Sequence, residues 1–409
     1  MKIKKFKSVG KEEINAAKNV IKSGVLSDFI GKKGDKFLGG KKVQEFEKKI
    51  CKFYNTKYAI VTNSWTSGLI CALGAINLEP GDEVICSPWT MSASAISILH
   101  WNAIPDLVDI NYNNFQLDID QLKRKITKKT KAIMAVDIFG QSENIKELKK
   151  ISKKYNLKII SDSAQSPYSF LKGKLAGTMT AIGGYSLNCH KHINTGEGGI
   201  LVTNNGKFAK KLRLIRNHAE SCVDNKTPIK DLSNMLGYNF RLGEIESAIG
   251  IEQLKKLPKI VKYRQQLANV FTQNLKSLKN LNLPKIEKNN THSYYVYPLI
   301  LKDKISKKRK KIIYELRKLG VPGLMEGYIN LAKLPIFQKK IAYGTKGFPW
   351  KYFNSKVSYS LNNFKNAEKL NKESFIGILL CSYDYKISDM RIIARKFNRV
   401  WEKLNLNNE

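Results

Sequence analysis

The amino-acid sequence predicts an α/β fold, in which helices cover both faces of a mostly parallel β-sheet. The first observation is that short apolar runs alternate with segments of helical periodicity through the first 260 residues. Such alternation is typical of parallel sheets, because each parallel crossover needs a long, usually helical, connection. The second observation is composition: 42% of the 409 residues are hydrophobic and 26% are charged, as in soluble globular proteins. This composition excludes a wholly disordered or collagen-like chain.

The expected elements follow one another at short intervals. Short apolar runs that are rich in β-branched residues favour buried strands, and apolar residues at helical spacing favour helices. The sequence predicts strands over residues 58–62, 83–86, 104–108, 131–137, 158–161, 184–187 and 199–203. It predicts helices over residues 67–76, 91–101, 119–126 and 145–155.

The pattern changes near residue 255, and we expect a second domain after it. The expected elements of this part are a long helix over 260–278, a strand over 294–301 and helices over 305–319 and 388–404. We therefore predict a large α/β domain with an N-terminal arm over residues 1–260, and a smaller α+β domain over residues 261–409. No internal repeat is visible in the sequence.

The chain is strongly basic, and the charge has two interpretations. Lys+Arg 72 minus Asp+Glu 34 gives a net charge of +38. A positive surface can bind nucleic acid, but these basic residues are scattered along the chain, so we favour compositional drift. The basic run at residues 307–311 is either a nucleic-acid patch or the solvated start of a helix, and we favour the helix. We expect no specific nucleic-acid partner.

The cysteines and the N-terminal residues indicate a cytoplasmic protein. The six cysteines form no C-x-x-C pair and no dense framework, which is typical of free thiols in a reducing compartment. The N-terminal residues lack the apolar core of a signal peptide. No window is long and apolar enough for a membrane helix, so we expect no membrane insertion. No metal site is predicted. The cysteines are Cys51, Cys71, Cys86, Cys189, Cys222 and Cys381.

Two polar segments lie at the ends of expected strands, where open α/β sheets bind ligands. The hydroxyl-rich segment at residues 63–69 starts a helix, so it can bind a phosphate; taken alone, it is better explained as an ordinary N-cap by Ser64 or Thr66. In the segment at residues 159–165, Asp162 can meet a cationic ring nitrogen and Gln165 can donate to an oxygen on the same ring. A helix cap or a loop salt bridge is the alternative for this second segment.

Two further segments carry residues that are unusual for a loop. Lys191 stands between two histidines and just before a glycine turn. A lysine that forms a Schiff base needs a neutral amine, which burial or nearby cations supply although its ordinary pKa is about 10.4. The alternative is a surface lysine in a lysine-rich chain. The fourth segment, GYNFR at residues 237–241, precedes a helix and is otherwise an ordinary loop.

These four segments occur in the order and spacing of one family. The sequence resembles the DegT/DnrJ/EryC1/StrS family, the pyridoxal-phosphate-dependent sugar aminotransferases, over most of its length. The resemblance implies the aspartate-aminotransferase fold (fold type I), with a seven-stranded large domain and a smaller C-terminal domain. The motifs that carry it are GGKKVQEFEKK before the first strand, DIFGQ at 137–141, DSAQS at 162–166, KHINTGEGG from Lys191 and GYNFRL from Gly237.

The resemblance implies pyridoxal 5′-phosphate as the cofactor, and it assigns residues to the cofactor ring. Lys191 matches the catalytic lysine that binds the cofactor covalently, Asp162 the carboxylate on the pyridine nitrogen and Gln165 the partner of the ring hydroxyl. Met91 stands where an aromatic residue usually stacks on the ring; its polarizable sulfur can cover a ring face, and Trp89 is an alternative.

The resemblance also assigns residues to the phosphate. Thr66 and Ser67 match the phosphate-binding turn, and Ser186 matches a phosphate-binding serine upstream of the lysine. Asn239 matches an asparagine that reaches the phosphate of the neighbouring subunit, which implies a homodimer with shared active sites. Trp65 departs from the family pattern, because a small residue is usual at its position.

The function that the resemblance implies is transfer of an amino group from glutamate to a nucleotide-linked keto-deoxysugar, for cell-surface polysaccharide or glycan biosynthesis. One branch of the family replaces the lysine by histidine and removes a hydroxyl group, so the two histidines beside Lys191 leave a sugar dehydratase as an alternative. An aminotransferase for a cyclic ketone that is not a sugar nucleotide is another. A basic nucleic-acid-binding or regulatory protein on the same scaffold is the alternative from another class.

Overall fold

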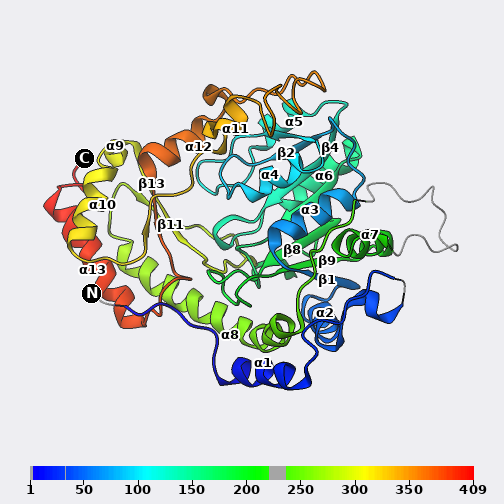
Figure 1. Ribbon diagram of the computed structural model, residues 1–409. Helices are drawn as coiled ribbons and strands as arrows, with labels where there is room; N and C mark the ends of the chain where they lie inside the picture. The colour runs from blue at the N-terminus through cyan, green and yellow to red at the C-terminus, as the bar shows by residue number, and fades with distance from the viewer. Residues whose placement is uncertain (1–2, 33, 221–235) are drawn as a thin grey trace.

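A seven-stranded β-sheet forms the centre of the first part of the chain (Figure 1). The computed structural model describes residues 3–32, 34–220 and 236–409. The strand order is β1-β9-β8-β5-β4-β2-β3, and within this sheet β9 runs antiparallel to both of its neighbours. The predicted seven-stranded, mostly parallel sheet is thus confirmed. Its strands are β1 (Tyr58–Thr62), β2 (Glu83–Cys86), β3 (Ile104–Leu107), β4 (Thr130–Val136), β5 (Lys158–Asp162), β8 (Ile182–Ser186) and β9 (Gly199–Thr203).

Helices cover both faces of this sheet, because alternate residues of each strand point to opposite sides. In β4, Met134 packs in the cluster beneath α3 and α4, whereas the adjacent Ile133 packs beneath α5 and α6. Burial of one such side chain stabilises the fold by roughly 1.5–3 kcal/mol. The helices of the first face are α3 (Trp65–Ala75), α4 (Ala93–Leu99) and α7 (Gly206–Arg216), and those of the second are α2 (Lys41–Tyr54), α5 (Ile119–Lys125) and α6 (Ile145–Tyr155).

A smaller antiparallel sheet, in the order β10-β11-β13-β12, forms the second part of the chain. It packs against α10 and α13, and both described chain ends lie beside it (Figure 1). The N-terminal arm is bound there, since Phe6 N donates to Ser382 O. The elements are β10 (Leu281–Asn282), β11 (Tyr297–Leu301), α9 (Asp303–Ser306), α10 (Arg309–Lys318), β12 (Leu324–Met325), α11 (Pro335–Gln338), α12 (Lys365–Lys369), β13 (Phe375–Ile378) and α13 (Ile387–Lys403).

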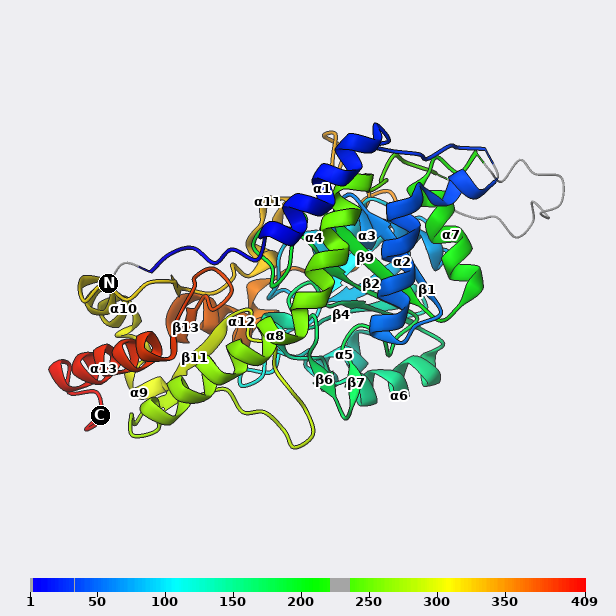
Figure 2. The same cartoon turned by 90° about the horizontal axis from the view of Figure 1, so that it is seen from below.

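One long helix, α8 (Glu244–Leu275), joins the two parts, with α1 (Lys11–Ser23) and α2 beside its first half and α13 beside its second (Figure 2). The prediction that this helix begins at residue 260 is wrong. Buried side chains such as Leu254 and Val261 continue one apolar stripe past Pro258, so packing outweighs the hydrogen bond that the proline removes. The boundary expected at residue 260 therefore falls inside a continuous helix, and the division into two domains stays a prediction.

The basic run at residues 307–311 differs from the expected solvated start of one helix. The chain makes two helices there, α9 and α10, and Arg309 is buried. Its Nη1 atom donates to the carbonyl oxygens of Glu326, Leu370 and Phe375. A buried cation needs such partners, so this residue anchors α10 to the small sheet.

The short elements complete the described fold. A small hairpin is formed by β6 (Phe170–Leu171) and β7 (Lys174–Leu175). The five described cysteines are free thiols, as expected, and Cys222 lies outside the described residues. Among the helices that the structure describes, none has the length and apolarity that a membrane crossing needs. One-turn helices occur at Asp35–Leu38, Ile138–Gly140, Leu331–Lys333 and Leu361–Asn363, and a π-helical turn occurs at Leu370–Ser374.

Candidate active site

A cavity of about 420 Å³ lies at the carboxyl edge of the large sheet. The loops that follow β1, β2, β5 and β8 form its floor, because these strands run in one direction and end at the same edge. Tyr295 and Tyr328 from the second part of the chain form its other wall. Six of the residues singled out in the sequence line this cavity: Thr66, Met91, Asp162, Gln165, Ser186 and Lys191.

Lys191 lies on a closed loop between β8 and β9. Backbone bonds from Leu187 N to Gly198 O (2.8 Å) and from Thr195 N to Leu187 O (3.0 Å) close the base of the loop. Gly196 has φ of +85°, a left-handed conformation that glycine adopts without strain. The glycine turn therefore fixes the loop that carries the lysine.

The Lys191 side chain lines the cavity and is only partly exposed. Its Nζ atom lies 4.6 Å from the centroid of the Tyr295 ring. Burial lowers the pKa of this amine, although the charge of Asp162 opposes the shift. The neutral, nucleophilic form of the amine is thereby favoured, and a lysine that forms a Schiff base needs this form.

The two histidines beside this lysine differ in position. His190 is exposed and lines the cavity, whereas His192 is fully buried outside its lining. The Nε2 atom of His192 lies 2.8 Å from the carbonyl oxygen of Ser293, so this nitrogen carries the proton and donates it. Burial lowers the pKa of His192 well below its ordinary value. We conclude that His192 is a neutral packing residue behind Tyr295, whose ring centroid is 6.3 Å away.

Asp162 ends β5 as a buried carboxylate held by several donors. The indole Nε1 of Trp65 donates to its Oδ1 atom at 2.7 Å, and the hydroxyl of Ser94 donates to its Oδ2 atom at 2.6 Å. The backbone N–H of Ala164 also reaches Oδ1, at 3.3 Å. Burial of a carboxylate is costly unless it is hydrogen-bonded, and these donors meet that need.

Neither side-chain donor to Asp162 was predictable from the sequence alone. Ser94 was not singled out, because it lies inside the first turn of α4 and small polar residues are common there. The sequence marks Trp65 only as a departure from the family pattern and gives no sign that it is a donor. Its unusual size was the one available signal.

Gln165 is oriented by two neighbours. Its Oε1 atom accepts the backbone N–H of Phe139 at 2.9 Å, and its Nε2 atom donates to the Tyr328 hydroxyl at 2.8 Å. An amide nitrogen carries two protons, so one remains for a ligand in the cavity. This arrangement suits the predicted bond to an oxygen of a bound ring.

Hydroxyl groups gather at the start of α3. Ser64 is the N-cap of this helix, since its Oγ atom accepts the N–H of Ser67 at 3.0 Å. Ser64, Thr66 and Ser186 line the cavity beside the free N–H groups of the first turn, which suits an anion. Ser67 is not brought to the cavity wall; its hydroxyl donates to Asn63 Oδ1 at 2.7 Å. A phosphate-binding role for Ser67 stays a prediction.

The structure separates the remaining predicted residues. Met91 is 56% exposed and lines the cavity, whereas Trp89 is fully buried between Tyr328 and Phe375 and does not line it. Asn239 lies outside the cavity of its own chain, exposed.

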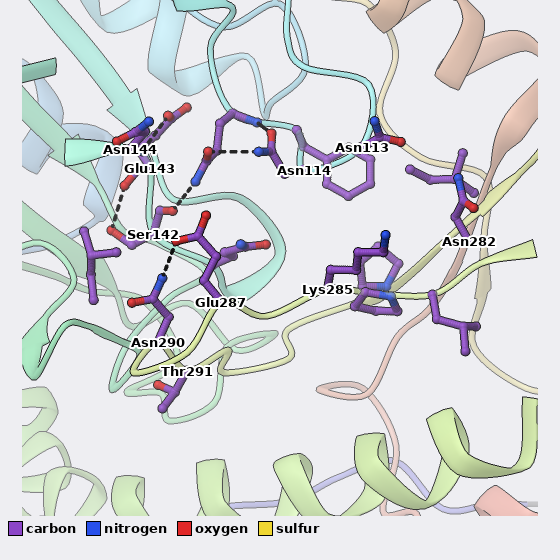
Figure 3. Close-up of a pocket in the computed structure, with 18 of the residues that line it drawn as sticks. Asn113, Asn114, Ser142, Glu143, Asn144, Asn282, Lys285, Glu287, Asn290 and Thr291 are labelled. Atoms are coloured by element: carbon purple, nitrogen blue, oxygen red, sulfur yellow. Dashed lines mark hydrogen bonds between the residues drawn. The ribbon is translucent and has the colours of Figure 1, made fainter. Parts of the chain in front are cut away.

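A second cavity of about 440 Å³ lies between the large sheet and the second part of the chain (Figure 3). Its lining is rich in amide side chains, together with Lys285 and Glu287. We place the active site in the first cavity because that one brings an amine and a buried carboxylate together. The labelled amide residues of the second cavity are Asn113, Asn114, Asn144, Asn282 and Asn290.

Two buried carboxyl groups belong to these linings, Asp137 to the first cavity and Glu143 to the second. Asp137 Oδ1 accepts the N–H of Glu143 at 2.7 Å, and its Oδ2 atom accepts the hydroxyl of Ser163 at 2.5 Å. Burial raises the pKa of Asp137 to about 7 and that of Glu143 to about 8. Repulsion between negative charges adds to both shifts, from Asp162 on Asp137 and from Asp137 on Glu143.

Comparisons with known proteins agree with this geometry. A GDP-perosamine synthase of Caulobacter vibrioides is 32% identical over 302 residues, which cover 72% of this chain and 80% of that protein. A UDP-4-amino-4,6-dideoxy-N-acetyl-beta-L-altrosamine transaminase of Campylobacter jejuni is 30% identical, with coverage of 81% and 85%. The solved structure of Helicobacter pylori PseC, an aminotransferase of pseudoaminic acid biosynthesis, matches with a TM-score of 0.80 and 26% identity over 98% of this chain and all of that one.

The family comparison extends over most of the chain. A family model matches residues 10–370, which include the loops that carry Lys191, Asp162 and the start of α3. The large sheet and the cavity at its edge are thus parts of the matched region. The chain belongs to the DegT/DnrJ/EryC1/StrS aminotransferase family.

Proposed function

We propose that this aminotransferase uses pyridoxal 5′-phosphate to move an amino group from glutamate to a nucleotide-linked keto-deoxysugar, for cell-surface glycan biosynthesis. The observation that carries the proposal is the cavity that brings together the amine of Lys191, whose pKa burial lowers, and the buried carboxylate of Asp162. The relatives named as perosamine synthases and amino-sugar transaminases support the choice of acceptor.

The donor set of the cavity fits pyridoxal 5′-phosphate. Lys191 supplies an amine for the aldehyde of the cofactor, and Asp162 supplies an acceptor for its ring nitrogen. Gln165 supplies a spare amide proton for its ring hydroxyl. The start of α3 supplies the N–H and hydroxyl groups that a phosphate needs. When bound, this cofactor supplies an electron sink for carbanion charge.

The chain's own residues then have distinct tasks. Lys191 moves the proton at the reacting carbon, because burial lowers the pKa of its amine and so favours the neutral form that can accept a proton. Asp162 holds a positive charge at the ring nitrogen. The ring of Tyr295 lies against the amine and contributes to the burial that lowers its pKa. Met91 lies at the open side and covers one face of whatever ring occupies the cavity.

We further propose a homodimer with shared active sites. Asn239 is exposed and lies outside its own cavity, although Asn63, which precedes α3, donates to its carbonyl oxygen at 3.4 Å. Arg241 Nε donates to its Oδ1 atom at 2.8 Å and orients the amide. The proposal is supported by this outward placement beside the phosphate-binding turn. The free thiols favour a cytoplasmic location for the dimer.

Product analysis tests the reaction. The purified protein is incubated with the cofactor, nitrogen-15-labelled glutamate and a panel of nucleotide-linked keto-sugars, and products are identified by mass spectrometry. We expect one amino sugar that carries the label, and none with Lys191→Ala. A deoxy sugar without nitrogen would favour the dehydratase alternative. No turnover of any sugar nucleotide, with turnover of another cyclic ketone, would overturn the acceptor assignment.

Mixing two inactive variants tests the shared site. If Asn239 serves the neighbouring site, a heterodimer of Lys191→Ala and Asn239→Ala chains contains one site with both residues intact. We expect co-refolded mixtures to regain activity that neither variant shows alone. A mixture as inactive as its components, or a monomer by light scattering, would contradict the shared site.

A further inference from the structure

We infer that Trp65 is a positioning residue that fixes the Asp162 carboxylate and leaves its Oδ2 atom as the acceptor for a ring N–H in the cavity. The inference deepens the proposed function and rests on it. It starts from a residue whose size departs from the family pattern and whose indole N–H lies 2.7 Å from Oδ1 of Asp162.

The indole of Trp65 is packed in one position in the fold. Trp65 is the first residue of α3 and is 6% exposed. Its six-membered ring lies against two glycines, Gly68 on α3 and Gly184 on β8. A Cβ atom at Gly68 would come within 2.8 Å of the ring, and one at Gly184 would overlap it. The ring is therefore held from the helix and from the sheet at once, so its N–H points in one direction.

The hydrogen bonds leave one acceptor position on the carboxylate. A carboxylate has about four lone-pair sites, two on each oxygen. Oδ1 accepts two bonds, from Trp65 at 2.7 Å and from Ala164 N at 3.3 Å, whereas Oδ2 accepts one, from Ser94 at 2.6 Å. The remaining site lies on Oδ2. A ring nitrogen that is protonated must therefore donate to Oδ2.

Trp65 acts through Asp162 rather than on the reacting atoms. The torsion that turns a carboxylate has broad energy wells, so a carboxylate with donors on one side only can rotate. The indole N–H and the Ser94 hydroxyl hold opposite oxygens and prevent this rotation. A hydrogen bond to a charged group is equivalent to roughly a ten- to hundredfold change in an equilibrium constant. The effect of its loss should appear in cofactor affinity.

The test compares two tryptophans of the same core cluster. Trp101 is also 6% exposed and donates its indole N–H, at 2.8 Å, to the carbonyl oxygen of Ile70, outside the lining of the cavity. Trp65→Phe and Trp101→Phe each remove one buried indole N–H. Pyridoxal 5′-phosphate is titrated into the full-length protein freed of cofactor, and its absorption band and dissociation constant are measured.

We expect the dissociation constant to rise about tenfold in Trp65→Phe and less than twofold in Trp101→Phe. The absorption band of the bound cofactor should also shift in Trp65→Phe, because its ring nitrogen is held less firmly in the protonated form. Equal values for the two variants would overturn the inference. Tighter binding by Trp65→Phe would also overturn it, because the indole would then occupy the place of the ring nitrogen.

A second variant guards against a folding defect in the first. Gly68→Ala introduces a methyl group against the indole and leaves its N–H in place. We expect Gly68→Ala to weaken cofactor binding in the wild-type protein and to have little further effect in Trp65→Phe. Additive effects would show that Gly68 acts independently of the indole, and would contradict the claim that packing against Gly68 positions the indole. A wild-type protein that binds no cofactor would refute the proposed function itself, which separates the two failures.

Discussion

Replacement of Asp137 by asparagine should flatten the dependence of stability on pH. Burial raises the pKa of this carboxyl group to about 7, whereas an exposed aspartate has a pKa of about 3.9. Between these values the folded state holds a proton that the unfolded state has lost. The stabilisation is therefore fully present below about pH 4 and is lost as the pH rises through about 7.

The magnitude follows from the difference between the two pKa values. A difference of about 3 units, at 1.36 kcal/mol for each unit, corresponds to at most about 4 kcal/mol in the free energy of unfolding. The amide that Asp137→Asn introduces cannot titrate, yet its oxygen can still accept the N–H of Glu143 and its nitrogen can donate to Ser163. The substitution thus removes the titration and keeps the contacts.

Urea denaturation at a series of pH values between 4 and 8 measures this effect. We expect the wild-type free energy of unfolding to fall over this range by a few kcal/mol more than that of Asp137→Asn. Ser166→Ala is the matched control, because the Ser166 hydroxyl donates to the backbone oxygen of Asp137 at 2.6 Å and carries no titrating proton. If wild type and Asp137→Asn had the same slope, the carboxyl group would not be protonated in the folded state and the reasoning would be refuted.

Two further substitutions test other parts of the structure. Arg216 is fully buried and pairs with Glu47 at 2.6 Å, so Glu47→Leu should leave an unpaired buried cation. We expect the free energy of unfolding, measured by urea titration, to fall by about 3–5 kcal/mol. A fall below about 1 kcal/mol would contradict the burial of this ion pair. Ser94→Ala removes the donor to Oδ2 of Asp162 and should weaken cofactor binding about tenfold. The control, Ser97→Ala, removes a buried hydroxyl that donates to Ser94 O and should change the affinity less than twofold. Equal effects of the two substitutions would refute the role of Ser94 in holding Asp162.

The strands of the large sheet could be predicted because their signal is local. Runs such as YAIVT at residues 58–62 are apolar on both faces, as strands buried between two helix layers must be. The ends of helices were predicted less accurately than the strands. The helix expected over 91–101 covers only Ala93–Leu99, since Met91 belongs to the loop that lines the cavity.

Features that depend on distant contacts were not predictable. The continuity of α8 through Pro258 depends on α1, α2 and α13, which pack along it from three separate places in the chain. The strand expected to begin at residue 294 begins at Tyr297, because Tyr294 takes a left-handed conformation with φ of +53°. No pattern in the sequence indicates that three helices pack along α8, and none indicates that Tyr294 takes a left-handed conformation.

The site was predictable to the extent that its residues form local motifs. Lys191 and Asp162 stand in short segments with a recognisable order, and the structure brings both to one cavity. The side-chain donors to Asp162 lie on α3 and α4, which follow β1 and β2, whereas Asp162 ends β5. The roles of Ser94 and of the Trp65 indole can therefore be recognised only in the structure.

The central claim is that Lys191 is the amine to which the cofactor binds. The most direct measurement is borohydride reduction of the protein after incubation with pyridoxal 5′-phosphate, followed by peptide mass spectrometry of wild type and Lys191→Ala. We predict a single stoichiometric adduct on the peptide that contains residue 191, and no adduct in the variant. An unmodified residue 191 in wild type, or an equal adduct on another lysine in both proteins, would contradict the account.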